Sequence, residues 1–221
     1  MNKSNICFLL RTLKERYPDV KTQLDHQTPF QLLTATILSA QCTDRQVNQV
    51  TQRLFAQFPD PAALAGADLS DIKKIVFSTG FYNNKAKNIK ACARALLERH
   101  HGLVPDDLDL LVKLPGVGRK TANVVRSAAF GHPAIVVDTH VLRISGRLGL
   151  TTHTDPVKVE FDLMRRIPES AWSDLSLQFI YFGREICDAR KPLCQNCPLQ
   201  DICVFPGKAS RSLGSAGSSG R

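Results

Sequence analysis

The sequence predicts an all-α fold, because apolar residues recur at helical spacing and strand-like alternation is nearly absent. Apolar side chains three and four positions apart lie on one face of a helix. Three stretches show this spacing: Val47, Val50, Leu54, Phe55 and Phe58; Ala86, Ile89, Ala93, Leu96 and Leu97; and Trp172, Leu175, Phe179 and Phe182. The one β-branched run, at 134–137, is too short for a sheet, so we expect an extended connector there. With 221 residues the chain can build one or two hydrophobic cores.

Residues that begin and end helices lie where this pattern requires them. Gly80, Gly102 and Gly131 follow periodic stretches, and glycine commonly follows the last turn of a helix. Asp155 followed by Pro156 predicts an N-cap and a first helical turn. The N-terminal segment predicts an amphipathic helix without a secretory signal, and no stretch of the sequence is apolar enough to span a membrane.

The composition indicates a polyanionic partner. The chain has 29 Lys and Arg against 20 Asp and Glu, which gives a formal net charge of +9 and a pI of about 9.4. Nucleic acid is the commonest partner of such a chain, although a basic protein without such a partner has the same charge. The missing secretory signal favours a reducing compartment, in which cysteines stay as thiols or bind metal. The tail at 206–221 is rich in Gly, Ser and Arg and is predicted to be disordered.

The segment 107–131 predicts two helices joined by a tight glycine turn. An apolar helix is expected to end at Leu114, and a second helix is expected to start at Arg119. Between them, Gly116 and Gly118 permit the turn and leave backbone N–H groups open to a phosphate at the positive end of the second helix. This helix-hairpin-helix pattern therefore predicts DNA binding that does not read base sequence.

Lys120 falls in the first turn of that second helix. Most lysines are solvated surface groups, and a lysine amine attacks carbon only when it is uncharged. The positive end of the helix, the adjacent Arg119 and desolvation by bound DNA all disfavour the ammonium form. We therefore predict that Lys120 is a nucleophile.

Asp138 opens the next predicted helix and has two candidate roles. It can cap the helix, and it can stabilise positive charge that develops on a deoxyribose ring. A carboxylate held against Lys120 would favour the charged amine, so we expect Asp138 to face the sugar or a bridging water instead. His140 and Arg143 follow at helical spacing and are candidate phosphate contacts, with solvated or internally bonded side chains as the alternative.

The seven cysteines divide into two groups. Four of them form a closely spaced set that one metal centre can reach: Cys187, Cys194, Cys197 and Cys203. The other three are expected to be small core residues: Cys7, Cys42 and Cys92. The spacing of the set leaves an iron–sulfur cluster and a tetrahedral zinc site as equal alternatives. Between the first two thiols, Arg190 and Lys191 lie in a loop at 188–192 that we expect to be a rigid phosphate-binding projection.

Five sequence motifs together resemble the endonuclease III family. They are LSAQCTD at 38–44, GFYNNKA at 80–86, LPGVGRKTANVV at 114–125, VDTH at 137–140 and the cysteine set. The resemblance implies a six-helix barrel domain at 22–132, a second domain at 1–21 plus 133–205, and DNA bound in the cleft between them. It also implies one four-iron four-sulfur cluster on the four cysteines.

The resemblance further implies a two-step reaction on damaged double-stranded DNA. Lys120 attacks C1′ with help from Asp138, expels an oxidised pyrimidine such as thymine glycol, and forms a Schiff base. β-Elimination then nicks the strand 3′ to the lesion. The protein is expected to work as a monomer, without a membrane partner and, if bacterial, in the cytoplasm at the nucleoid.

An enzyme of this kind must flip the damaged nucleotide out of the duplex and fill the gap that it leaves. By resemblance, Gln41 and the residue at position 81 fill that gap. Here Phe81 stands where the family usually has Leu, so we expect a larger aromatic wedge and a shifted lesion preference. The alternative is that Phe81 packs on the barrel.

Three other classes of protein share some of these features. Adenine-mispair glycosylases share the hairpin and the cluster but lack the lysine, and they carry a further C-terminal domain. A DNA-binding protein with an iron–sulfur redox sensor would not need Lys120 with Asp138. A zinc-stabilised DNA-binding module would lack the visible absorbance of an iron–sulfur cluster.

Overall fold

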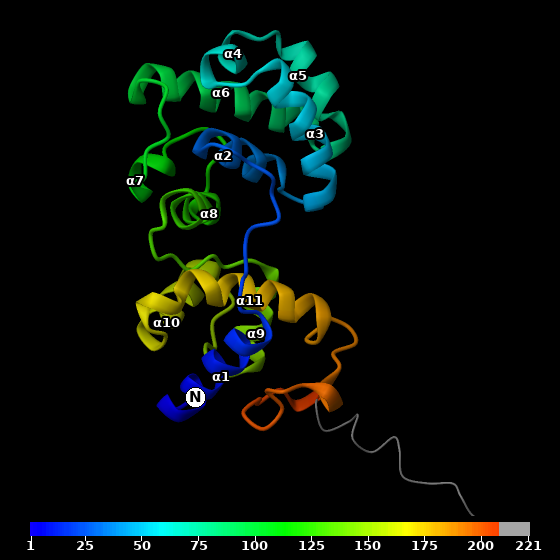
Figure 1. Cartoon of the computed structure of the whole chain (residues 1–221), viewed down its shortest axis with the longest axis vertical. Helices are drawn as coiled ribbons and strands as arrows, with labels where there is room; N and C mark the ends of the chain where they lie inside the picture. Colours follow the sequence, from blue (N-terminus) through cyan, green and yellow to red (C-terminus); the bar gives the residue numbers. More distant parts are fainter. Residues whose placement is uncertain (208–221) are drawn as a thin grey trace, which may run out of the picture. The chain divides into compact units, whose positions relative to one another are not determined.

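The computed structural model describes residues 1–207, which form helices and connecting loops without any strand (Figure 1). The predicted all-α fold is thus confirmed over those residues, and the extended connector at 134–137 is confirmed with it. Most of the tail predicted to be disordered lies outside the described residues. The chain divides into two compact units. The first unit is Lys21–Ala134, and the second unit joins Met1–Val20 to the chain from Ile135 onward.

The first unit consists of consecutive helices, four of which begin at a polar residue that caps them. Thr28, Thr43, Asp60 and Asp107 each accept a hydrogen bond from a backbone N–H of the first turn, which satisfies a donor that the helix leaves unpaired. The elements are α2 (Pro29–Leu38), α3 (Asp44–Gln57), α4 (Pro61–Gly66), α5 (Leu69–Val76), the 3-10 turn η1 (Phe77–Thr79), α6 (Tyr82–His100), α7 (Leu108–Leu111) and α8 (Arg119–Phe130).

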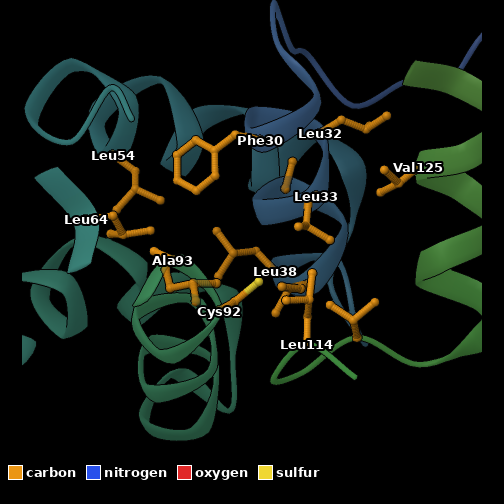
Figure 2. Packing of buried hydrophobic residues seen from close by; sticks show 14 of the residues in the cluster. Phe30, Leu32, Leu33, Leu38, Leu54, Leu64, Cys92, Ala93, Leu114 and Val125 are labelled. Carbon is orange, nitrogen blue, oxygen red and sulfur yellow. The ribbon is translucent and has the colours of Figure 1, made fainter. Parts of the chain in front are cut away.

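Helix α2 forms the centre of the first unit's core. Every residue of α2 except Pro29 and Gln31 is buried, as expected for a helix that is apolar on all sides. It contacts α3, α6 and α8. Figure 2 shows Phe30 of α2 on the same side of the cluster as Leu54, and Val125 of α8 on the other side. The core therefore depends on side chains from helices that are far apart in the sequence.

The second unit combines the N-terminal helix with the C-terminal part of the chain. Its elements are α1 (Lys3–Arg16), α9 (Thr139–Arg147), α10 (Pro156–Arg166), the 3-10 turn η2 (Glu169–Ala171), α11 (Trp172–Glu185) and the 3-10 turn η3 (Cys194–Asn196). The predicted cap of α10 is confirmed, since Asp155 accepts from the Lys158 N–H and Pro156 follows it. Phe179 and Phe182 of α11 are buried beside residues of α1 and α9.

Glycine allows α9 and α11 to approach closely in the second unit. A Cβ on Gly183 of α11 would lie 2.5 Å from Nδ1 of His140 and 2.8 Å from a guanidinium nitrogen of Arg143. Both neighbours belong to α9. A side chain at position 183 would therefore displace the side chains of His140 and Arg143, two of the predicted site residues.

Two sequence-based expectations are wrong. The first helix of the hairpin ends at Leu111, three residues before the predicted end at Leu114, and a turn closed by the Leu114 N–H on the Leu111 carbonyl follows it. The proline at 115 disfavours helical backbone at Leu114 itself, which excludes the predicted end there. Cys7 is exposed, because α1 buries the face that carries Ile6, Leu9 and Leu13. The other two expected core cysteines are confirmed, since Cys92 is buried and Cys42 packs against the core.

Among the described residues, no helix combines the length and the apolar character that crossing a membrane requires. The longest helix, α6, runs from Tyr82 to His100 and carries charged residues along its length. The three glycines predicted to follow helices lie where the structure ends them. Gly80 follows η1, Gly102 lies just beyond α6, and Gly131 caps α8 with a left-handed backbone.

Candidate catalytic and DNA-binding site

The hairpin turn fits against α6 only because residue 116 has no side chain. Gly116 has a φ of +76°, and a Cβ built there would lie 2.8 Å from Cβ of Asn88. Both the left-handed backbone and the contact exclude larger residues. Packing within the protein therefore requires glycine at 116, and no sequence pattern indicates the role of Asn88.

Gly118 differs from Gly116, because nothing lies within 4 Å of a Cβ built there. It is the N-cap of α8, has an extended backbone with a φ of −90°, and supplies no side-chain hydrogen bond to the helix. The first turn of a helix has N–H groups without intrahelical partners, and these attract anions. Gly118 therefore adds no side chain at the N-terminus of α8, and binding of a phosphate there remains a prediction.

Lys120 is the second residue of α8 and its side chain is exposed. The buried face of α8 consists of Ala122, Asn123 and Val125, and the first turn contains no acidic residue. Arg119 precedes it in the same turn. The structure thus places the predicted nucleophile at the positive end of a helix, on a face that the core does not cover.

Asp138 caps α9, as one of its two predicted roles requires. Its Oδ1 accepts hydrogen bonds from the backbone N–H groups of His140 and Val141, both at 2.8 Å. The cap uses one carboxylate oxygen. Capping therefore does not exclude a second role for this half-buried side chain on the deoxyribose.

Gln41 and Phe81 share an unusual backbone conformation. Their φ angles are +53° and +46°, a region that residues with a side chain rarely adopt. Both side chains are exposed, and the exposed fraction of Phe81 is 66%. Strained backbone of this kind gathers at functional sites. Because its side chain is mostly exposed, Phe81 does not pack on the helices around it. The aromatic contact in this loop is between Phe77 and Tyr82, whose ring centroids are 4.8 Å apart.

His140 and Arg143 make contacts within the protein. The Nε of Arg143 donates to the carbonyl of Cys187 at 3.1 Å, and its guanidinium also donates to the carbonyl of Gly183 at 3.2 Å. The same guanidinium lies 3.1 Å from Nδ1 of His140, and burial lowers the pKa of that histidine. These contacts join α9 to the start of the cysteine segment, while phosphate contacts by the two residues remain a prediction.

Arg147, which no sequence motif indicated, holds both ends of the cysteine segment. Its guanidinium donates to Sγ of Cys187 at 3.2 Å and to the carbonyls of Asp188 and Ala189 at 2.8 and 2.9 Å. Its own carbonyl accepts from Sγ of Cys203 at 3.3 Å. One arginine of α9 therefore fixes the first and the last cysteine together.

Asp188 gives the basic loop its shape. Its Oδ1 accepts from the backbone N–H groups of Arg190 and Lys191, both at 2.8 Å, and these hydrogen bonds lower the pKa of Asp188. Arg190 and Lys191 are exposed. The loop is thus held internally by Asp188 and from α9 by Arg147, so its two basic residues project from a rigid turn.

The four clustered thiols fit a metal centre with thiolate ligands. Burial, together with smaller contributions from the other three thiols, raises the pKa of Cys197 to about 11, so the four sulfur atoms lie within electrostatic reach of one another. A metal centre offsets such repulsion, and iron–sulfur clusters bind through Cys thiolates. Over residues 1–207, no group of three or more His, Cys, Asp or Glu side chains has the geometry to bind a single metal ion.

Two protein families match the chain. The HhH-GPD superfamily of base excision DNA repair proteins matches residues 34–169, and the iron-sulfur binding domain of endonuclease III matches residues 187–203. The second match begins at Cys187 and ends at Cys203. It decides between the two metal centres that the spacing left open, and the cofactor is a single four-iron four-sulfur cluster.

Relatives named endonuclease III match nearly the whole chain. The Synechocystis sp. protein is 53% identical and the match covers 88% of this chain and 90% of the relative. For Bacillus subtilis the identity is 47%, with 92% and 93% covered, and for Escherichia coli K12 it is 41%, with 94% and 99% covered.

Solved structures agree with the sequence matches. A non-covalent endonuclease III–DNA complex is 45% identical with a TM-score of 0.90, and the match covers 96% of this chain and 99% of that one. A trapped covalent endonuclease III–DNA intermediate gives the same identity and TM-score, with 96% and 100% covered. A thermostable thymine-DNA glycosylase, 23% identical, shares the fold with a TM-score of 0.81. The chain therefore belongs to the endonuclease III family, DNA glycosylases with abasic-site lyase activity within the HhH-GPD superfamily of base excision DNA repair proteins.

Proposed function

We propose that this protein removes oxidised pyrimidines of the thymine glycol type from double-stranded DNA and then cleaves the abasic site through a Schiff base on Lys120. The observation that supports this most directly is the position of Lys120, exposed in the first turn of α8 directly after the open cap at Gly118. A phosphate bound at that helix end would bring the deoxyribose of a flipped nucleotide toward the amine.

The chemistry then proceeds in two steps. The uncharged amine of Lys120 forms a bond to C1′ while the glycosidic C–N bond breaks, and the base leaves with the bonding electrons and takes up a proton. The sugar ring opens to a Schiff base. Loss of a proton from C2′ then breaks the C3′–O bond, which leaves a nick 3′ to the lesion.

We propose that Asp138 acts on the sugar and not on the lysine. Its carboxylate would stabilise the positive charge that develops on the ring as the base departs. The cap on α9 uses only Oδ1, so the helix holds the carboxylate in place while leaving its other oxygen for this role.

Residues of both units would contact DNA. In the first unit we propose that Gln41 and Phe81 enter the gap that the flipped nucleotide leaves, and that the hairpin binds a phosphate through its backbone. The exposed, aromatic side chain of Phe81 can stack on an unpaired base. The proposed phosphate contacts are Gly116, Gly118, Arg119, His140, Arg143, Arg190 and Lys191.

The cluster, when bound, supplies a rigid centre of covalent metal–sulfur bonds to a segment with little secondary structure. The hydrogen bonds of Arg147 and Asp188 fix the basic loop beside this segment, and Arg190 and Lys191 of the loop are exposed. We propose that the protein acts as a monomer on chromosomal DNA.

Borohydride trapping on a duplex with a single abasic site tests the lyase activity. Borohydride reduces a Schiff base to a stable amine, so an enzyme of this class becomes covalently attached to its DNA. The wild-type protein is expected to trap and Lys120→Ala is not. Lys158→Ala is a matched control, because Lys158 is also an exposed lysine in the first turn of a helix, α10.

Two outcomes would contradict the proposal. If the wild-type protein failed to trap, the lyase assignment would be wrong, and if Lys120→Ala trapped as well as wild type, the nucleophile would be another residue. Substrate class is tested separately with duplexes that contain thymine glycol or an adenine mispair. Release of adenine in preference to thymine glycol would favour the adenine-mispair alternative.

A further inference from the structure

Lys85 is a buried lysine in the first unit that neither the core nor the proposed chemistry explains. It is the fourth residue of α6, and its exposed fraction is 5%. Lysine is almost never fully buried without a partner, and a positive charge near the N-terminus of a helix opposes the helix dipole. Burial lowers the pKa of Lys85. A Met or Leu at this position would serve the core better, so the amine has another role.

The amine of Lys85 holds the loop that presents Phe81. Its Nζ donates to the carbonyl of Thr79 at 2.7 Å. Thr79 is itself buried, and its hydroxyl donates to the carbonyl of Val76 at 2.7 Å. Gly80 and Phe81 follow directly, both with positive φ. The hydrogen bond from Lys85 therefore fixes the backbone immediately before the strained residue.

The same amine lies near the loop that presents Gln41. The Cys42 thiol is close enough to raise the pKa of Lys85 against the effect of burial. Cys42 follows Gln41, whose φ is +53°, and its N–H donates to the carbonyl of Ser39 at 3.0 Å. A second link between the two regions is the hydrogen bond from Nε2 of Gln46 in α3 to Oγ of Ser78 in η1, at 2.7 Å.

We propose that Lys85 is a positioning residue that fixes the Gln41 loop and the Phe81 loop relative to each other, so that both side chains enter the DNA together. Non-glycine residues with left-handed backbone persist only where surrounding contacts stabilise them, and Lys85 supplies such a contact at the Thr79 carbonyl, directly before Gly80 and Phe81. The inference rests on the proposed function, because it concerns residues whose role in DNA is itself proposed. Lys85 is buried and therefore does not touch substrate.

The test compares Lys85→Met with Lys87→Met. Methionine keeps the length and the apolar stem of lysine and removes the amine. Lys87 lies two residues further along α6 and is exposed, so its variant removes the same charge without disturbing the loops. Each protein is assayed on an abasic site in a duplex and on an abasic site in a single strand, where no base stack has to be opened.

We expect Lys85→Met to lower cleavage of the duplex about 10- to 100-fold, because small displacements of positioned groups have effects of that size. Cleavage of the single strand should stay at the wild-type rate. A 2-aminopurine base opposite a non-cleavable abasic analogue should brighten on binding wild type and Lys87→Met, and much less on binding Lys85→Met. Equal losses on both substrates would show that Lys85 only supports the fold, and would overturn the proposal.

A double-mutant cycle tests the link to the two loops directly. In a background of Gln41→Ala with Phe81→Ala, the Lys85→Met change should have little further effect on duplex cleavage, because it has nothing left to position. Additive losses would contradict the inference. Borohydride trapping of the wild type separates a failure of the proposed function from a failure of this inference. If the wild type does not trap, the proposed function is rejected. If it traps and the losses in the double-mutant cycle are additive, only the role of Lys85 is rejected.

Discussion

Gly116 packs directly against Asn88, since a Cβ on residue 116 would lie only 2.8 Å from the Asn88 Cβ. This relationship divides the two glycines of the hairpin into different roles. Gly116 lets the turn pack on α6, and Gly118 leaves the N-terminus of α8 open.

Substituting the two glycines should therefore affect different properties. Gly116→Ala is expected to lower the free energy of unfolding by about 1–3 kcal/mol, because it combines a steric contact with an unfavourable φ. Gly118→Ala should lower the free energy of unfolding by less than about 1 kcal/mol, because alanine is a poorer N-cap than glycine, and should weaken binding to an abasic duplex about 10-fold. Urea unfolding and a binding titration at fixed salt measure the two effects, and the opposite assignment of effects would refute this division.

Asp138→Asn separates the capping role from the proposed catalytic role. Asparagine caps helices about as well as aspartate, so the free energy of unfolding should change by less than about 0.5 kcal/mol. The negative charge is lost, and base release from a thymine glycol duplex should slow about 100-fold or more. Asp155→Asn, at the cap of α10, is the matched control for a change of cap without a change at the sugar. Unchanged base release would confine Asp138 to capping.

Arg147→Met should weaken retention of the cluster. The substitution removes the hydrogen bond to Sγ of Cys187 and the contacts to the 188 and 189 carbonyls. Loss of an interaction with a metal ligand commonly lowers metal affinity about 10- to 100-fold. Iron content and visible absorbance after dialysis against a chelator measure this, with the exposed Arg166→Met of α10 as control. Equal iron content in both variants would contradict the role of Arg147.

Ser145→Ala is expected to stabilise the protein. Within the described residues, the Ser145 Oγ is buried and makes no hydrogen bond, so removal of the hydroxyl should raise the free energy of unfolding by up to about 1 kcal/mol. Ser176→Ala provides the contrast. The hydroxyl of Ser176 accepts from the Val136 N–H and donates to the Trp172 carbonyl, so its loss should destabilise by about 1–3 kcal/mol. A destabilised Ser145→Ala would indicate that the hydroxyl has a partner in solution.

Asp162 should make stability depend on pH in the acid range. The hydroxyl of Thr151, together with His153 and Arg165, holds the pKa of this carboxyl well below its usual range. A carboxyl with a lowered folded-state pKa stabilises the protein above its unfolded-state pKa, and that contribution is lost as pH falls below about 5. The difference in melting temperature between wild type and Asp162→Asn should therefore stay nearly constant from pH 7 to about pH 5 and shrink as the pH is lowered from there toward about pH 2. A difference that stayed constant over this lower range would show that Asp162 does not titrate in this way.

Local sequence patterns predicted the fold class and much of the candidate site. Helical spacing, the caps and the glycine turn are properties of short segments, and they placed Lys120 in the first turn of α8 and Asp138 at the cap of α9. The four cysteines also lie within one short segment, so their spacing alone indicated a metal centre.

The roles of Lys85, Asn88 and Arg147 arise only in the tertiary structure. Each acts on backbone or side chains from another element, so no local spacing distinguishes these residues from ordinary members of a helix. The exposure of Cys7 has the same origin, because which face of α1 is buried depends on the helices that pack against it. The sequence by itself determined the helices and the chemistry that they carry. Packing between distant segments decided how the loops and the cysteine segment are held, because those contacts join residues that lie far apart in the chain.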